Sequence, residues 1–159
     1  MSVHAGAFHF TQLGQEDAEA IAAWRYPEPY TFYNWTEDPG DLRELLDPSL
    51  RGEAYWAVAD HAGELVGHFS FKPKDEGTVE IGLGLRPDLT GRGLGGSFLA
   101  AGLEFARTRF APERFVLSVA TFNERAIKVY ERAGFASVRV YTHSTNGGEW
   151  EFVEMARPA

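Results

Sequence analysis

The feature that most constrains the fold is the stretch of residues 80–107, EIGLGLRPDLTGRGLGGSFLAAGLEFAR. Its first part alternates, with Ile81, Leu83 and Leu85 on one face, which predicts a strand that ends before Pro87. Four glycines follow within six residues, and an apolar stripe at helical spacing comes after them. Glycine lets the backbone turn tightly and approach a ligand, and the first amides of a helix are free to bind an anion. The stretch therefore predicts a strand, a phosphate-binding turn and a helix.

The glycine turn alone admits more than one interpretation. Residues 91–96 read GRGLGG, which formally fits the dinucleotide-binding fingerprint G-x-G-x-x-G. That fingerprint belongs to the first turn of a βαβ unit and needs an acidic residue at the end of the next strand. Here the motif falls past the middle of the chain, and Glu113, at about the right distance, precedes the next predicted strand. A nucleotide-binding oxidoreductase is therefore disfavoured.

A second stretch, residues 123–135, reads NERAIKVYERAGF. Asn123 is a suitable N-cap and Gly134 a suitable residue after a helix C-terminus. Ala126, Ile127 and Tyr130 are spaced for one helical face. The stretch predicts a short helix that follows a strand over residues 115–121.

Together the two stretches resemble the GNAT superfamily of acyl-CoA N-acyltransferases. In that family a loop of pattern R/Q-x-x-G-x-G/A holds the cofactor pyrophosphate, and an Asn is followed seven residues later by a Tyr and then by Gly-Phe. This sequence has TGRGLG at residues 90–95, then Asn123, Tyr130 and Gly134-Phe135. Thr90 departs from the family's Arg or Gln, but the contacts of this loop are mostly made by backbone amides. The stretch EIGLGLRPDLTGRGLG resembles the branch of ribosomal-protein N-terminal acetyltransferases.

The resemblance implies acetyl-CoA as co-substrate and assigns roles along the chain. The pantetheine arm would pair with the predicted central strand at Leu83, Gly84 and Leu85, and Asn123 would contact the same arm. The pyrophosphate would lie in the loop formed by Gly91, Arg92, Gly93, Leu94, Gly95 and Gly96. Tyr130 would donate a proton to the departing thiolate, a role that suits a phenol near the sulfur. The alternative for Tyr130 is a half-buried helix residue that covers the core.

An attacking amine must be neutral, so some group must take its proton. Some N-terminal acetyltransferases of the family keep a Glu five residues before the Asn, where this chain has Ser118. Glu80 on the predicted central strand is the best substitute, and a cross-strand salt bridge is an equally open reading of it. His68 and His143 are reserve bases, and the alternative for each, which is the more frequent case, is a surface histidine.

Residues 26–35, YPEPYTFYNW, contain five aromatic side chains and two prolines that prevent a regular helix. The segment is either a loop folded over the core or the wall of a ligand site. In the GNAT family the connection between the first two helices commonly borders the acceptor site. Tyr30, Tyr33 and Trp35 are therefore the candidate substrate-binding residues.

The whole chain fits this interpretation. With 159 residues it is expected to form one domain, residues 1–159. The predicted strands are residues 7–13, 54–59, 64–72, 78–85, 115–121, 136–144 and 149–155, and the predicted helices are residues 15–24 and 41–46, the segment after the glycine turn, and the segment after Asn123. This order, β-α-α-β-β-β-α-β-α-β-β, matches the GNAT fold: an α/β (α+β) arrangement with a mixed, mostly antiparallel sheet flanked by helices.

Composition narrows the function classes. The net charge of −8 argues against a general nucleic-acid binder, and there is no Cys for a disulfide or a thiol nucleophile. No apolar run of membrane-spanning length and no signal segment are visible, so we expect no membrane partner and a cytoplasmic location. No cluster of His, Asp and Glu has metal-ligand spacing, so no metal is expected.

The sequence thus predicts an N-acetyltransferase that moves an acetyl group from acetyl-CoA to a primary amine. The acceptor is a small molecule or a protein N-terminus, and the sequence leaves this choice and the oligomeric state open. The alternative is a domain that binds acyl-CoA as a sensor without turnover.

Overall fold

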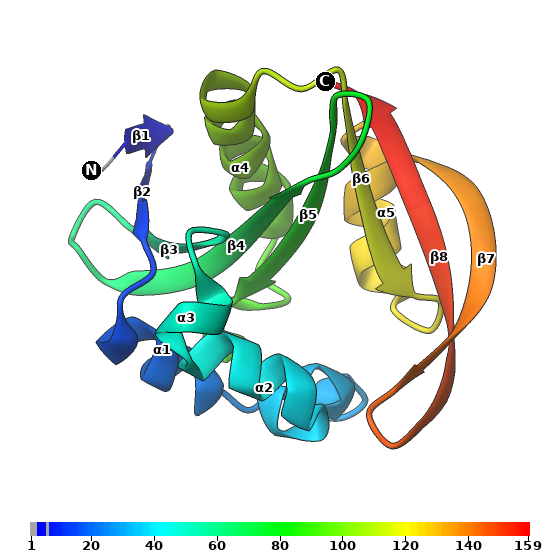
Figure 1. The fold of residues 1–159 in the computed structure, drawn as a ribbon, viewed down its shortest axis with the longest axis horizontal. Helices are drawn as coiled ribbons and strands as arrows, with labels where there is room; N and C mark the ends of the chain where they lie inside the picture. The colour runs from blue at the N-terminus through cyan, green and yellow to red at the C-terminus, as the bar shows by residue number, and fades with distance from the viewer. Residues whose placement is uncertain (1–2, 6) are drawn as a thin grey trace.

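The computed structural model describes residues 3–5 and 7–159, and its elements are shown in Figure 1. The strands are β1 (Val3–Ala5), β2 (Phe8–Gln12), β3 (Tyr55–Ala59), β4 (Leu65–Pro73), β5 (Thr78–Leu85), β6 (Arg114–Ala120), β7 (Ala136–Thr145) and β8 (Gly148–Pro158). The helices are α1 (Gln15–Ala22), α2 (Pro39–Leu46), α3 (Pro48–Arg51), α4 (Gly95–Phe110) and α5 (Glu124–Arg132), with short 3-10 turns η1 (Tyr30–Tyr33), η2 (Trp35–Glu37) and η3 (Pro87–Leu89).

The described strands form one sheet in the order β1-β2-β3-β4-β5-β6-β8-β7. Every neighbouring pair is antiparallel except β5 and β6, which run parallel with α4 as their crossover. A parallel pair needs such a crossover because a tight hairpin can only reverse the chain. The expected mixed, mostly antiparallel sheet flanked by helices is confirmed.

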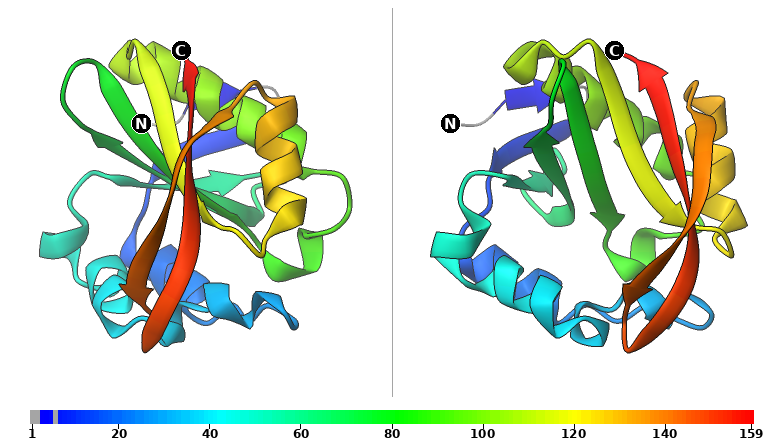
Figure 2. Two further views of the ribbon diagram at one scale, coloured as in Figure 1. Left: turned by 90° about the vertical axis from the view of Figure 1, so that its right-hand side faces the viewer. Right: turned by 45° about the vertical axis from the view of Figure 1, so that its right-hand side comes forward.

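The parallel pair is short, and this divides the sheet. Residues 78–80 of β5 pair with residues 114–116 of β6, and beyond them the two strands diverge, as Figure 2 shows for the green β5 and the yellow-green β6. β5 stays with β4 from Val79 to Leu85, and β6 stays with β8 from Arg114 to Ala120. The gap therefore lies between two continuous half-sheets.

Helices cover both faces of the sheet. On one face, α4 and α5 pack over a core that includes Phe69, Phe98, Phe105 and Phe115, all at most 3% exposed. On the other face, Ile21 of α1 and Leu45 of α2 pack in a smaller core against β3. Because strand residues alternate between faces, Ile81 points toward the first core while Glu80 and Gly82 lie on the opposite face of β5.

The structure adds to the predicted element order and adjusts it. β1 lies before the predicted first strand and pairs with β2. Residues 26–35 were predicted to form no regular helix, and within residues 30–37 the structure contains only the short turns η1 and η2. Pro48, which follows the helix predicted over residues 41–46, occupies the first turn of α3, where its missing N–H costs nothing and Asp47 caps the amide of Ser49 at 2.9 Å. Among the described residues no helix is long and apolar enough to cross a membrane.

The packing of α4 on β4 depends on a glycine. Gly102 is buried on α4, and a Cβ built on it would lie 2.2 Å from the ring of Phe69. The Gly102→Ala variant should lower the free energy of unfolding by about 1–2 kcal/mol, since overpacking outweighs the better helix propensity of alanine. Denaturant unfolding measures this. Gly96→Ala is the control, because a Cβ there meets nothing within 4 Å, and it should not destabilise the protein.

Candidate active site

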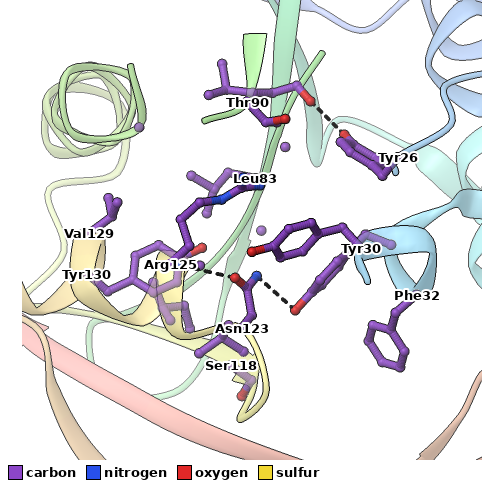
Figure 3. Close-up of a pocket in the computed structure, with 18 of the residues that line it drawn as sticks. Tyr26, Tyr30, Phe32, Leu83, Thr90, Ser118, Asn123, Arg125, Val129 and Tyr130 are labelled. Atoms are coloured by element: carbon purple, nitrogen blue, oxygen red, sulfur yellow. Dashed lines mark hydrogen bonds between the residues drawn. The ribbon is translucent and has the colours of Figure 1, made fainter. Parts of the chain in front are cut away.

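A cavity of about 1000 Å³ opens where β5 and β6 diverge. Residues 81–85 of β5 form one wall and residues 117–119 of β6 the facing wall. The aromatic segment before α2 and the first turns of α5 complete the lining, as Figure 3 shows. The volume is at the upper end of the usual range for small-molecule sites.

The glycine turn forms one end of this cavity. Gly91 and Gly93 have φ angles of 73° and 78°, in the left-handed region that favours glycine, and both line the cavity with Gly95. A Cβ on Gly93 would meet nothing within 4 Å, so the space beside the loop is open. α4 begins at Gly95 without a side-chain cap. Its free first amides and positive dipole end suit a phosphate group.

The other members of the predicted loop are placed differently. Arg92 and Leu94 are not lining residues of the cavity, and Gly96 lines a second, smaller hollow on the outer side of α4. Thr90, the departure from the family pattern, donates its hydroxyl to the carbonyl of Pro87 at 2.7 Å and so closes η3. The loop therefore offers backbone groups to the cavity.

The wall formed by β5 carries the three residues predicted to pair with the donor, Leu83, Gly84 and Leu85. Their edge faces the gap, since β6 pairs with β5 only through residues 78–80. Tyr26 donates its hydroxyl to the carbonyl of Leu85 at 2.7 Å, which ties the aromatic segment to the end of this strand. The aromatic segment therefore contacts the cavity wall formed by β5 directly.

Asn123 lies between α5 and the aromatic segment. Its Oδ1 accepts from the amide of Ala126 at 3.1 Å and caps α5, and its Nδ2 donates to the hydroxyl of Tyr33 at 3.1 Å. The predicted cap is thus present, and Asn123 also joins two elements that are 90 positions apart in the sequence. A contact of Asn123 with the cofactor stays a prediction.

Tyr130 of α5 lines the same cavity, with its ring edge-on to Phe135 at 6.1 Å between centroids. Its hydroxyl makes no hydrogen bond with any residue that the structure describes, so it is free to meet a ligand. Burial raises the pKa of Tyr130 well above its usual value, and the nearby Tyr33 adds to the rise. The phenol therefore keeps its proton at neutral pH, as a proton donor must.

Tyr30, Tyr33 and Trp35 all line the cavity, so the structure brings the three predicted acceptor-site residues together. The sequence did not point to their partners from the other end of the chain. Phe122 and Phe152 complete the aromatic wall.

The turn between β7 and β8 closes on this wall. Asn146 donates from Nδ2 to the carbonyl of Phe32 at 2.8 Å, and Thr145 donates its hydroxyl to Asp38 at 2.6 Å. These contacts link positions more than 100 residues apart. Sequence spacing carries no signal for them.

Of the candidate bases, Glu80 lies outside the cavity. It sits where β5 still pairs with β6, and its carboxylate is 3.6 Å from the ammonium of Lys74. Ile81, the next residue of β5, lines the cavity because β5 and β6 separate after residue 80. The ion pair, one of the two readings of Glu80, is the arrangement that the structure contains.

His68, His143 and Ser118 do line the cavity. His68 is buried on β4 opposite Gly84, and its Nδ1 has no hydrogen-bond partner among the described residues. Burial lowers its pKa to about 4, so the imidazole is neutral at physiological pH. A Cβ on Gly84 would lie 2.6 Å from His68 Nε2, so a glycine is required there.

Most of the charged lining residues form two groups, and Glu124 on the first turn of α5 is an acidic exception within the cationic group. Arg125, Lys128 and Arg132 project from α5, and Arg125 Nη1 is 3.4 Å from the Cβ position of Gly91 in the glycine turn. Asp38 and Asp41 lie at the start of α2, beside the aromatic wall. Burial raises the pKa of Asp41, and the neighbouring Asp38 and Glu44 raise it further. The cavity suits an anion at one end and a cation at the other.

Among residues 3–5 and 7–159, no three His, Asp, Glu or Cys side chains gather as a metal site would need.

Residues 8–136 match the family model described as acetyltransferase (GNAT) domain. The chain belongs to the GNAT acetyltransferase family. The members of this family use acetyl-CoA as donor. Residues of the glycine turn and of the helix that Asn123 caps line the same cavity, and their roles toward the donor stay predictions.

Similar proteins support this assignment. The chain is 37% identical over 108 residues to mycothiol acetyltransferase of Salinispora arenicola, an alignment that covers 64% of this chain and 34% of the relative. The chain thus spans about a third of the length of this curated relative.

Solved structures match over nearly the whole chain. A GNAT-family acetyltransferase from Bacillus anthracis has a TM-score of 0.78 at 20% identity, covering 99% of this chain and 98% of the other. A spermidine N-acetyltransferase from Vibrio cholerae, in complex with CoA and spermine, has a TM-score of 0.77 at 20% identity, covering 96% and 95%. At this identity the likeness shows the fold alone. The resemblance to the branch of ribosomal-protein N-terminal acetyltransferases stays a prediction.

The buried His68 makes stability depend on pH. Its folded pKa of about 4 lies below the unfolded value of about 6.5, so the unfolded chain binds the extra proton as pH falls. Its contribution is present above pH 6.5 and is lost as pH falls toward 4. The free energy of unfolding should drop by about 2 kcal/mol from pH 7.5 to pH 5 on account of this residue.

Denaturant unfolding across that range tests the effect. His68→Gln removes the titrating group, so its stability curve should be flatter than that of the unaltered protein, whatever its absolute stability. Parallel curves would contradict the role given to His68.

Proposed function

We propose that this domain transfers an acetyl group from acetyl-CoA to the primary amine of a small cationic molecule. The observation that carries the proposal is the gap between β5 and β6, with a phosphate-binding turn at one end and a protonated phenol along its side. A linear donor can extend from the turn along the free edge of β5. Its thioester would then lie near Tyr130.

The reaction needs few groups. The amine nitrogen attacks the thioester carbonyl carbon, the carbon–sulfur bond breaks, and the thiolate takes a proton from the hydroxyl of Tyr130. The amide and free CoA leave. The nitrogen loses two protons: the one lost before attack, when the ammonium becomes a neutral amine, ends in solvent, and the one lost as the amide forms restores the hydroxyl of Tyr130, directly or through water. Asn123 would fix the start of α5, and with it the position of Tyr130, through its cap and its bond to Tyr33.

A cationic acceptor fits the far end of the cavity. Asp38 and Asp41 supply negative charge there, and Tyr33 and Trp35 supply aromatic faces that attract cations. The ring of Tyr30 already has the guanidinium of Arg125 over it, 4.1 Å from its centroid. The relatives named mycothiol acetyltransferase and the neighbour bound to CoA and spermine support acetyl transfer to a small amine. The hydrogen bonds from Thr145 and Asn146 close one side of this end, which favours a small molecule over a protein N-terminus.

The base remains a separate proposal. Glu80, the expected base, faces Lys74 outside the cavity. Asp41 is the carboxylate inside the cavity whose pKa is raised toward the working range of a base, so we assign the first proton transfer from the amine to Asp41, directly or through water.

Donor binding is tested by thermal shift and calorimetry. Acetyl-CoA should raise the melting temperature, whereas NAD and NADP should not. Gly93→Glu should reduce acetyl-CoA affinity at least about 30-fold, because it places a like charge in the phosphate position. Gly63→Glu is the matched control. Gly63 has a φ of 85°, a Cβ built on it would meet nothing within 4 Å, and its turn does not line the cavity. Equal affinity of both variants would rule out the glycine turn as the phosphate site.

Tyr130→Phe tests the chemistry. It keeps the ring and its packing but removes the proton donor, so acetyl-CoA affinity should stay within about twofold while kcat falls about 10²-fold or more. Release of the CoA thiol with a panel of diamines, amino sugars and peptides provides the rate and the acceptor. Full activity of Tyr130→Phe would mean that another group protonates the thiolate. If none of the amines in the panel supports release of the thiol, only the sensor function is left.

A further inference from the structure

Two polar side chains on β4 border the cavity without a hydrogen-bond partner. His68 and Ser70 are two positions apart, so they project from the same face of the strand, and both line the cavity. Among residues 3–5 and 7–159, no group pairs with the ring nitrogens of His68 or with the hydroxyl of Ser70. Polar groups withdrawn from water and left unpaired cost free energy, so these two side chains require an explanation.

Two glycines of β5 keep these side chains open to the cavity. Gly82 lies opposite Ser70 in the sheet, and Gly84 lies opposite His68. A Cβ on Gly82 would be 2.5 Å from Ser70 Oγ, and a Cβ on Gly84 would be 2.6 Å from His68 Nε2. Any larger residue at either position would therefore cover a polar atom that the glycine leaves free.

The state of the His68 ring decides what it can recognise. Burial lowers its pKa to about 4, so the imidazole is neutral and has one N–H donor and one acceptor nitrogen. Nδ1 is the buried nitrogen without a partner. A buried N–H without a partner is rare, whereas an unpaired acceptor is tolerated more often. The proton therefore belongs on Nε2, above Gly84, and this donor needs an oxygen as its partner.

Two indole rings hold the imidazole in this orientation. The ring centroids of Trp24 and Trp35 are 6.2 and 5.6 Å from that of His68. A side chain packed in this way cannot turn freely, so its donor has a fixed direction. Fixed donors discriminate between ligands better than mobile ones, because less conformational entropy is lost on binding.

The same region adjoins the acidic end of the cavity. Tyr55 lies opposite Ser70 on the neighbouring strand β3 and donates its hydroxyl to Glu44 of α2 at 2.8 Å. Asp41, one turn earlier on α2, lines the cavity with Tyr55. A small acceptor whose ammonium lies near Asp41 can therefore reach Ser70 and His68 with the rest of its structure.

A hydroxyl group has the chemistry that these side chains require. Its oxygen can accept from His68 Nε2, and the group can donate to Ser70 or accept from it. A second ammonium offers only donors and cannot pair with an N–H. A carboxylate could accept, but Asp38 and Asp41 repel its charge.

We propose that His68 and Ser70 form a hydroxyl-binding subsite, and that the acceptor is an amino alcohol or an amino sugar. Its ammonium is attracted to the acidic residues of α2, and its hydroxyl groups pair with β4. This proposal rests on the proposed function and names the substrate class of the same site.

The experiment measures release of the CoA thiol with acceptors matched in size. Aminopropanol, diaminopropane and propylamine share one chain length, and glucosamine and cyclohexylamine share a six-membered ring. In each set the hydroxylated amine should have a kcat/KM about tenfold above the others, which is the value of one or two neutral hydrogen bonds. We call this ratio the hydroxyl preference.

Variants of the two side chains locate the preference. His68→Phe keeps an aromatic ring but removes the donor, so the hydroxyl preference should fall about tenfold. His68→Gln places an amide nitrogen near the position of Nε2 and should retain most of it. Ser70→Ala removes only a hydroxyl and should lower the preference at least about threefold. Ser137→Ala, on the exposed edge strand β7 outside the cavity, is the matched control and should retain the full preference.

Other results would overturn the subsite. Diamines or alkylamines that react as well as the hydroxylated amines would refute it and leave the proposed function intact. A preference that survives both His68→Phe and Ser70→Ala would place hydroxyl recognition elsewhere. A higher kcat/KM for glycinamide than for ethanolamine would assign the donor to a carbonyl instead of a hydroxyl. If no amine supports thiol release, the proposed function itself fails, and the subsite with it.

Discussion

The separation of β5 from β6 is the constraint on which the rest of the structure depends. Strand edges carry backbone donors and acceptors, and a sheet normally satisfies them by pairing. Here each strand keeps its antiparallel neighbour along its whole length, so the facing edges of residues 81–85 and 117–119 border a cavity instead. A ligand with amide groups along its length can satisfy such an edge, which links the architecture of the sheet to an extended donor.

Small residues make the open arrangement compatible with a packed protein. On one face of β5, Gly82 and Gly84 leave room for the side chains of Ser70 and His68 on β4. On the other face, Gly102 lets α4 settle onto the ring of Phe69. β4, β5 and α4 are thereby held close together, and the glycine turn that joins β5 to α4 is fixed at both of its ends. The same glycines that tighten the core thus position the phosphate end of the cavity.

Much of this arrangement follows from local sequence signals. The alternation of Ile81, Leu83 and Leu85 predicted β5, and Asn123 was correctly expected to cap α5, because both features depend on neighbours a few residues away. The position of Glu80 relative to the cavity could not be predicted in this way. It depends on the residue at which two strands part, and this is set by the registers of both half-sheets.

Long-range contacts escaped prediction for the same reason. Asn146 reaches Phe32, and Arg157 of β8 joins Arg132 around one hollow, although nothing in the spacing of these residues relates them. The sequence left the aromatic segment open between a core loop and a ligand wall. In the structure Trp35 packs against the smaller core and the segment also lines the cavity, while its contact with a ligand stays a prediction. Tyr26 and Tyr33 anchor it to β5 and α5, while the exposed parts of its rings face the cavity.

The electrostatics of the cavity bear on the deprotonation of the acceptor. Its two ends are charged, mainly cationic on α5, where Glu124 is the exception, and acidic at α2. Burial keeps Tyr33, Tyr130 and His68 in their neutral forms. The desolvation that lowers the pKa of His68 acts in the same direction on any ammonium group that enters this region. The acidic end would therefore attract the acceptor as a cation, and the neutral middle would favour its amine form next to the thioester. On the proposed function, a base such as Asp41 then needs only modest strength, because the environment has already lowered the pKa of the group that it deprotonates.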